Sequence, residues 1–455
     1  MSTEYGLRPA PVAAAERIKT IDMIRGVALL GILLMNIPGF GLHWSRYFDI
    51  LKMPQHSVDY RTFETMMILF EGTMRGLFSM LFGAGMILFT MNKADVPGGA
   101  TVAEYYYRRL LWLMVFGLIN AFIFLWIGDI LFFYAFAGML IFPFRNLAPS
   151  KLVLMALLCL SITLLKYQAS FNDLRETRQA YNEAKKAEKN NRKLSESQKS
   201  AIAEWEGIEK NMLSIDSATI KKDLKQMHGS YGSVYRFLLP LIARDEINFL
   251  YHNNWDVLTM MFLGMAFFRW GFFSNRWSTQ LYWLTLLIGY GTGFAISYFH
   301  FTGFYGNILQ PGNYVDRFRI SPYQLYDFKR IAISLGHASL VILLYRSRLV
   351  PWLLHALGCV GQMAFTNYLM QSIICSFYFD GFGGDMYNRL RFHELYYVVG
   401  CVWLFQLIFS PIWLRYFRFG PFEWLWRSLT YWQKQPMRRT REKPLPVYEE
   451  PQLAS

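Results

Sequence analysis

Long apolar runs recur along the chain from Ile24 to Phe417, and each is close to the length that a helix needs to cross a bilayer, about 20 residues. Charged residues concentrate between these runs. The pattern predicts an all-α fold, a polytopic membrane bundle of about ten transmembrane helices. The predicted spans are roughly 24–42, 64–91, 110–127, 129–146, 151–168, 255–273, 279–300, 328–345, 353–378 and 394–417.

The segment 169–230 interrupts this pattern. It carries many charges of both signs, with alanines and scattered apolar residues such as Leu174 and Trp205. This composition predicts a helical hairpin outside the membrane that turns near Asn190-Asn191. Such a charged helix pair is either a solvated structural element or a gate or partner surface. Further upstream, only Ile127-Gly128-Asp129 separates the third and fourth spans, which indicates a tight turn between them.

Four regions follow from the distribution of the runs. They are an N-terminal transmembrane bundle of about five spans (1–168), the extracytoplasmic hairpin (169–230), a C-terminal bundle of about five spans (231–432) and a disordered cytoplasmic tail (433–455) rich in proline and charge.

Composition agrees with a membrane protein, since 54% of the residues are hydrophobic, 18% aromatic and only 17% charged. The net charge of +14 suits cytoplasmic loops and anionic lipid. Nucleic acid is not expected as a partner, because no basic stretch accompanies a recognisable reading module. The four cysteines lie in or near apolar runs without metal-ligand spacing, so we expect core thiols and no metal site.

The short loops show an asymmetry in Lys and Arg that predicts both termini on the cytoplasmic side. The expected location is the bacterial inner (cytoplasmic) membrane, with the lipid bilayer as a partner. The loop residues on the predicted inner side include Arg108, Arg109, Arg145, Lys151, Arg269, Arg276, Arg346 and Arg348.

Ionisable and polar groups at membrane depth are costly and are therefore the first functional candidates. Asp22 and Arg25 begin the first span, which ends with Asn36. They either anchor the helix at the interface or line a path for an anionic ligand. Glu71 and Arg75 lie four residues apart, a spacing that predicts a pair within one helix. Such a pair could be purely structural.

Asp129 lies in the turn before the fourth span, where it either caps that helix or moves a proton. His337 lies in the eighth span, and Asn367 and Gln371 share a face of the ninth. Hydrogen bonding between helices is one explanation for these three residues. A role for His337 as a general base is the alternative.

Several stretches of this sequence resemble the YeiB family of bacterial inner-membrane proteins, whose activity is largely unassigned. The stretches are Ile21-Asp22-Met23-Ile24-Arg25-Gly26, Gly128-Asp129-Ile130-Leu131, Gly361-Gln362-Met363-Ala364, Thr366-Asn367-Tyr368-Leu369, Ser410-Pro411-Ile412-Trp413 and Gly420-Pro421-Phe422-Glu423-Trp424.

That family is grouped with transmembrane acyltransferases, a superfamily that includes the lysosomal heparan-glucosaminide N-acetyltransferase. The resemblance implies a bundle that carries an acyl group from cytoplasmic acyl-CoA, such as acetyl-CoA, to an acceptor outside. Family members commonly have a histidine in the third span where this chain has Asn120. Asparagine cannot shuttle a proton at neutral pH. If that histidine is the base, this protein is inactive or uses another group.

The leading hypothesis is a membrane-bound acyltransferase acting on an extracytoplasmic sugar, lipid or envelope component. A basic cytoplasmic mouth would bind the CoA phosphates, and Asp129 and His337 would assist proton removal. The rivals are a transporter or flippase and a non-enzymatic scaffold, and a homo-oligomer is an open alternative. The binding candidates are Arg25, Asn36, Glu71, Arg75, Asn120, Asn367 and Gln371.

Overall fold

The computed structural model describes residues 18–91, 101–213, 216–252 and 254–439, and this part of the chain is helical and contains no strand. The helices of the first half are α1 (Lys19–Gly41), α2 (Ser45–Lys52), α3 (Val58–Leu69), α4 (Thr73–Thr90), α5 (Val102–Phe122), α6 (Leu131–Ile141), α7 (Pro149–Lys189), α8 (Glu196–Leu213) and α9 (Ser217–Met227). Those of the second half are α10 (Tyr231–His252), α11 (Asn254–Arg269), α12 (Thr279–Phe304), α13 (Pro311–Arg317), α14 (Leu325–Ser347), α15 (Pro351–Gln362), α16 (Ala364–Phe379), α17 (Leu395–Tyr416) and α18 (Pro421–Tyr431).

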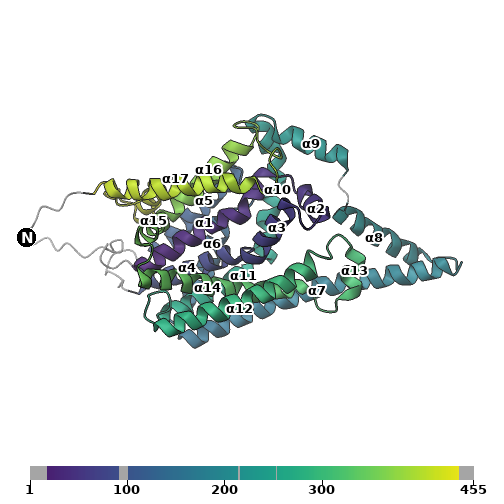
Figure 1. Ribbon diagram of the computed structural model, residues 1–455, viewed down its shortest axis with the longest axis horizontal. Helices are drawn as coiled ribbons and strands as arrows, with labels where there is room; N and C mark the ends of the chain where they lie inside the picture. Colours follow the sequence, from purple (N-terminus) through teal and green to yellow (C-terminus); the bar gives the residue numbers. More distant parts are fainter. Residues whose placement is uncertain (1–17, 92–100, 214–215, 253, 440–455) are drawn as a thin grey trace, which may run out of the picture.

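The long helices run roughly side by side, so the bundle has two ends (Figure 1). The end at which α1 starts, on the left of Figure 1, is called the basic end here, because Arg109, Arg145, Arg269 and Arg348 lie in its helix ends and loops. The other end is called the hairpin end, because α7 and α8 extend beyond the bundle there.

Helix length and composition confirm the predicted fold class. Among the described residues, five helical stretches are long and apolar enough to cross a membrane. A shorter apolar helix spans Leu131–Phe144. The five stretches are Lys19–Gly41, Val58–Thr90, Pro149–Lys189, Pro322–Ser347 and Leu395–Tyr416.

Two predicted spans are interrupted in the structure. The second breaks between α3 and α4 at Gly72, whose φ of 72° is a left-handed conformation suited to glycine. A Cβ there would also lie 2.3 Å from the Tyr326 hydroxyl. The ninth span breaks at Met363 into α15 and α16. Both runs are uniformly apolar, so the hydrophobic pattern could not reveal these breaks.

The turn between the third and fourth spans is longer than predicted. Helix α5 ends at Phe122 and α6 begins at Leu131, so residues 123–130 form the connection instead of three residues. Leu125 within it has a positive φ of 59°. The longer connection folds back into the protein, where Asp129 is only 1% exposed.

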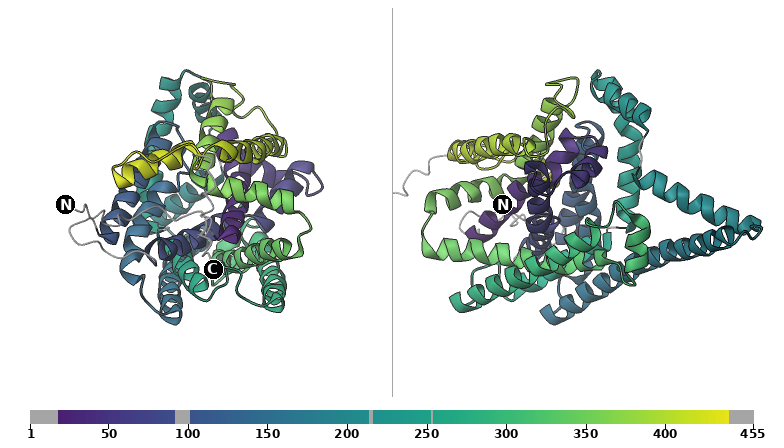
Figure 2. Two further views of the ribbon diagram at one scale, coloured as in Figure 1. Left: turned by 90° about the vertical axis from the view of Figure 1, so that its left-hand side faces the viewer. Right: turned by 45° about the vertical axis from the view of Figure 1, so that its right-hand side comes forward.

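The charged segment forms a helical hairpin, but its first arm continues from a membrane span. Helix α7 has 41 residues, which at 1.5 Å per residue is about 60 Å. It turns at the expected place, since Asn191 has a φ of 54°, and α8 returns along it as a V-shaped projection (Figure 2). Trp205 is fully buried between the arms, and Arg178 pairs with Asp316 of α13 at 2.9 Å.

Helices from both halves of the sequence pack together in one bundle. Helix α1 lies against α15 and α4, and α11 lies against α4 and α7. The α1–α15 contact is backbone to backbone: a Cβ on Gly361 would lie 1.8 Å from the Asp22 carbonyl oxygen. Residues 433–439 return to α17 through a bridge between Phe417 and Arg438. Residues 440–455 of the predicted disordered tail lie outside the described residues.

Candidate functional site

A cavity of about 250 Å³ begins at the basic end and runs between α1, α4, α5, α6, α16 and α18. Its walls are mainly apolar and aromatic, whereas its mouth carries arginines. The mouth residues are Asp22, Arg25, Arg109 and Arg427, and the deeper walls include Phe82, Leu110, Leu113, Phe365 and Tyr368.

Short contacts fix the arginines of the mouth. The Nη1 of Arg25 lies 2.9 Å from the Asp22 carboxylate, and the Arg25 side chain remains 25% exposed. Arg109 stacks over Trp426, with its guanidinium carbon 4.1 Å from the ring centroid. Arg427 lies over Phe419 in the same way, at 4.4 Å. Only one carboxylate balances these three cations at the mouth, so the mouth attracts anions.

A second cavity of about 690 Å³ adjoins the first, because Asp22 and Gln362 line both. It is also basic, with Lys19, Arg348 and His355 among its lining residues. The two cavities therefore offer a polar, positively charged space beside an apolar one.

The break between α15 and α16 forms part of the cavity wall and is held by α18. Glu423 of α18 accepts hydrogen bonds from the backbone N–H groups of Phe365 (2.7 Å) and Thr366 (3.0 Å), which are orphan donors in the first turn of α16. The Thr366 hydroxyl also donates to it, at 2.5 Å. Glu423 therefore caps α16 from another helix, and this cap gives a physical reason for the Gly420–Trp424 motif.

At the deep end of the cavity, Ile130 and Tyr368 are lining residues and lie next to Asp129. One Asp129 oxygen accepts from the Phe132 backbone N–H at 3.0 Å, so Asp129 caps α6 as predicted. Its other oxygen accepts from the side-chain amide of Asn120 at 2.8 Å and lies 3.5 Å from the Tyr368 hydroxyl. The structure therefore brings together two candidates, Asp129 and Asn120.

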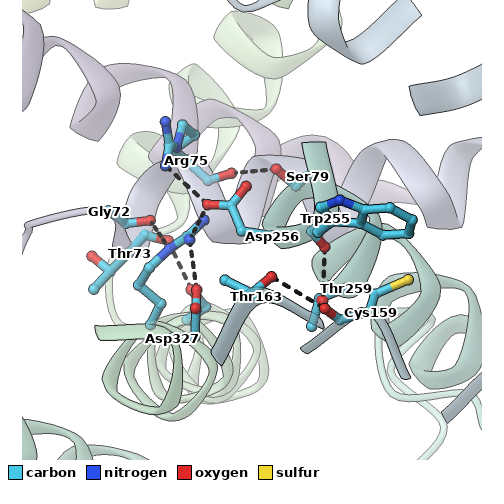
Figure 3. Close-up of polar contacts among 12 residues, drawn as sticks. Gly72, Thr73, Arg75, Ser79, Cys159, Thr163, Trp255, Asp256, Thr259 and Asp327 are labelled. Carbon is cyan, nitrogen blue, oxygen red and sulfur yellow. Dashed lines mark hydrogen bonds and ion pairs between the residues drawn. The ribbon is translucent and has the colours of Figure 1, made fainter. Parts of the chain in front are cut away.

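Behind the cavity lies a buried ion-pair network that corrects the predicted pair of Glu71 and Arg75 (Figure 3). Glu71 precedes the start of α4, so the two residues do not share a helix as the four-residue spacing required. Arg75 instead pairs with Asp256 of α11 at 3.2 Å. Asp256 also binds Arg330 of α14 at 2.5 Å, and Arg330 binds Asp327 at 3.0 Å.

Glu71 belongs to a neighbouring part of the same region. Its carboxylate lies 2.5 Å from Lys329 Nζ and accepts from the Tyr305 hydroxyl at 2.6 Å. The Lys329 amine also lies 3.2 Å from His300 Nδ1. Tyr134 links this region to the cavity that it lines, because its hydroxyl donates to the Arg75 carbonyl oxygen at 3.1 Å.

The remaining candidates lie elsewhere. His337 contacts the Tyr290 hydroxyl at 2.8 Å, between α14 and α12, and is not among the residues that line the two cavities. Asn367 contacts Ser410 at 3.0 Å and Gln371 contacts Gln406 at 3.0 Å, which are the interhelical hydrogen bonds considered above. Asn36 lies half-buried towards the end of α1.

Sequence reasoning missed Asp256, Asp327, Lys329 and Arg330, which are between 0 and 2% exposed. They lie at the starts of the predicted spans 255–273 and 328–345, where charge is usual. The signal that could have found them is the density of charge, since three ionisable residues occupy a single turn of α14. Glu246 of α10 was missed as well, because α10 was not predicted as a helix.

No group of three or more His, Cys, Asp or Glu side chains in the described ranges is placed to hold a metal ion. The absence of a metal cofactor stays a prediction.

The fold and these buried charges define a polytopic helical membrane protein. Residues 267–433 match the family described as "Protein of unknown function (DUF418)". The chain is 28% identical over 448 residues to the uncharacterized protein YxaH of Bacillus subtilis, covering 94% of this chain and 97% of that protein. It is 29% identical over 435 residues to the uncharacterized protein YeiB of Escherichia coli, covering 91% and 96%. No solved structure matches the chain significantly.

These matches confirm the resemblance to the YeiB family on which the motif analysis rested. They support a membrane protein of unknown function, because these relatives are themselves uncharacterized.

Proposed function

We propose that the protein is a membrane acyltransferase that moves an acyl group from cytoplasmic acyl-CoA to a hydroxyl or amine of an extracytoplasmic sugar, lipid or envelope component. The observation that carries the proposal is the cavity that joins an arginine-rich mouth to Asp129. Acyl-CoA has the matching polarity, since a polyanionic nucleotide is joined to a less polar thioester arm.

The two cavities divide this donor in a simple way. The phosphates would lie at Arg25, Arg109 and the basic second cavity, where charge-assisted hydrogen bonds are strongest. The thioester arm would occupy the apolar cavity and reach Tyr368. The basic end would then face the cytoplasm, as the positive-inside rule favours.

Asp129 is the proposed base at the deep end. Its carboxylate takes the proton of the acceptor hydroxyl or amine as that oxygen or nitrogen bonds to the thioester carbon. The carbon–sulfur bond breaks, and the proton then passes from Asp129 to the departing thiolate. Asn120 donates to Asp129 and orients it, so the proposed mechanism does not need the histidine that family members commonly have there.

Binding and turnover in purified protein, with radiolabelled acetyl-CoA and longer acyl-CoA donors, test this proposal. Arg25→Ala should weaken acyl-CoA binding about tenfold or more, because a lost hydrogen bond to a charged group costs about 1.5–3 kcal/mol. Asp129→Asn should leave binding nearly unchanged and slow transfer about 10²–10⁴-fold. Arg145→Ala is the matched control, since Arg145 lies at the same end and lines neither cavity.

Normal turnover in Asp129→Asn would remove Asp129 from the mechanism, because asparagine is also a good helix cap. Wild-type protein that neither binds acyl-CoA nor cleaves its thioester bond would contradict the acyltransferase proposal itself.

A transporter is the second candidate, and the buried network favours it. Glu71, Asp256 and Asp327 face Arg75, Lys329 and Arg330 beside the broken helix α3–α4, and interrupted helices with buried charge are typical of transport sites. Uptake of a solute or lipid by proteoliposomes, lost in Lys329→Met, would support transport. Acyl transfer without uptake would exclude it.

A further inference from the structure

Glu246 is a buried carboxyl group on α10 that the proposed mechanism does not use. It continues a stripe of residues spaced four apart, Val234, Leu238 and Ile242, which are buried against Ala121 and Leu125 at the end of α5. Glu246 therefore lies on the buried face of an amphipathic helix, with a relative exposure of 6%. A carboxyl group in such a position is costly unless it is neutral or paired.

Aromatic contacts fix this part of α10 against the site. Phe249, almost one turn beyond Glu246, stacks on Phe133 of α6 with ring centroids 3.9 Å apart. The Arg75 guanidinium lies over the other contact surface of Phe249, 5.5 Å from its centroid. Since Phe133 follows Asp129 by four residues, these contacts hold Glu246 near the base.

The two carboxyl groups differ sharply in their hydrogen bonds. Asp129 accepts from the Phe132 N–H and the Asn120 amide, with the Tyr368 hydroxyl 3.5 Å away, which favours its ionised form. Among the described protein groups, neither carboxyl oxygen of Glu246 has a hydrogen-bond partner. This environment favours the neutral acid.

The charges around Glu246 act in the same direction. Helix α10 is not among the helices apolar enough to cross a membrane. Burial, followed by the charges of Asp129 and Asp245, raises the pKa of Glu246 to about 8. Helix α9 packs against the start of α10, through Met227 and Val234, away from this carboxyl group.

We propose that Asp129 and Glu246 form a carboxyl pair that holds one proton, with Asp129 as the charged member and Glu246 as the neutral one. Glu246 is then a positioning residue: by staying protonated it avoids a second negative charge beside the base. When Glu246 loses its proton, Asp129 should bind a proton more tightly. The effect on transfer rests on the proposed acyltransferase function, whereas the sharing of one proton does not.

Dicyclohexylcarbodiimide tests the pair directly, because it modifies protonated carboxyl groups in apolar surroundings. We expect Glu246 to be modified at pH 7 in the full-length protein, with mass spectrometry locating the adduct, and the rate to fall to half near pH 8. In Asp129→Asn the half-rate point should move to higher or lower pH according to the charge removed. Loss of a neighbouring negative charge makes ionisation of Glu246 easier, so the expected shift is to lower pH.

Asp245 is the internal control, since it is adjacent in sequence but exposed and 3.5 Å from Arg244. It should react far less than Glu246, and Glu246→Gln should lose the adduct at position 246 only. Absence of modification at Glu246, or a half-rate point that Asp129→Asn leaves unchanged, would overturn the pair. The readout needs no turnover, so an unlabelled Glu246 in an active transferase and a labelled one in an inactive protein are separate results.

Discussion

Replacement of Asp256 by asparagine tests the buried network most directly. Asp256 is 2% exposed and binds two arginines, Arg330 at 2.5 Å and Arg75 at 3.2 Å. Asparagine has nearly the same shape but no charge, so the variant leaves two guanidinium groups near one another with Asp327 as the remaining carboxylate at Arg330. The perturbation is therefore electrostatic, with little change in packing.

The magnitude follows from which partner is stranded. Removing one member of a buried ion pair typically costs about 3–5 kcal/mol. Arg330 is fully buried and cannot reach water, so Asp256→Asn should lie in that range. Arg75→Leu should cost less, about 1–2 kcal/mol, because Asp256 keeps its shorter contact with Arg330 and the Arg75 side chain is already 26% exposed.

Thermal unfolding in detergent can separate these cases. At roughly 2 °C per kcal/mol for a chain of this size, Asp256→Asn should lower Tm by about 6–10 °C and Arg75→Leu by about 2–4 °C. Lys185→Ala removes an exposed ion pair with Glu188 and should change Tm by less than about 2 °C, since surface pairs contribute little. Equal losses for the two network variants, or a larger loss for Arg75→Leu, would refute the assignment of Asp256 as the shared carboxylate.

Two further predictions concern packing and topology. Gly361→Ala should lower Tm strongly or prevent stable expression, because its Cβ would lie 1.8 Å from the Asp22 carbonyl oxygen, whereas Gly358→Ala, whose nearest contact is Met23 at 3.6 Å, should be tolerated; equal Tm values would contradict the close α1–α15 approach. A cysteine at Ser195, at the tip of the α7–α8 hairpin, should react with an impermeant thiol reagent on intact cells; reaction only after permeabilisation would reverse the proposed orientation.

The hydrophobic pattern predicts the fold class well because lipid imposes one strong requirement, an apolar helix of sufficient length. It is insensitive to interruptions within a run. The breaks at Gly72 and Met363 depend on tertiary contacts, namely the Tyr326 hydroxyl beside Gly72 and the cap that Glu423 supplies to α16. Neither contact is local in sequence, so helix periodicity carries no trace of it.

The candidate site was partly predictable for the same reason. Asp129 and Asn120 come from adjacent elements, and a cap in a short turn is a local feature, so their contact is close to what the sequence indicated. The spacing of Glu71 and Arg75 was misleading because a four-residue interval means a shared face only inside a continuous helix. Asp256 and Arg330 are 74 residues apart, and only the folded bundle shows that they meet.

These contacts also suggest why so many charges are retained in an apolar bundle. Tyr134 lines the cavity and donates to the Arg75 carbonyl oxygen, while Phe249 connects the Arg75 side chain to the α10 segment that carries Glu246. Arg75 therefore lies between the ion-pair network and both groups of the proposed proton pair. A network that only stabilised the bundle could be replaced by apolar residues at little cost. One that fixes the position of Arg75 beside Tyr134 and Phe249 would also set the geometry at Asp129, and its charges would then be needed for activity as well as for stability.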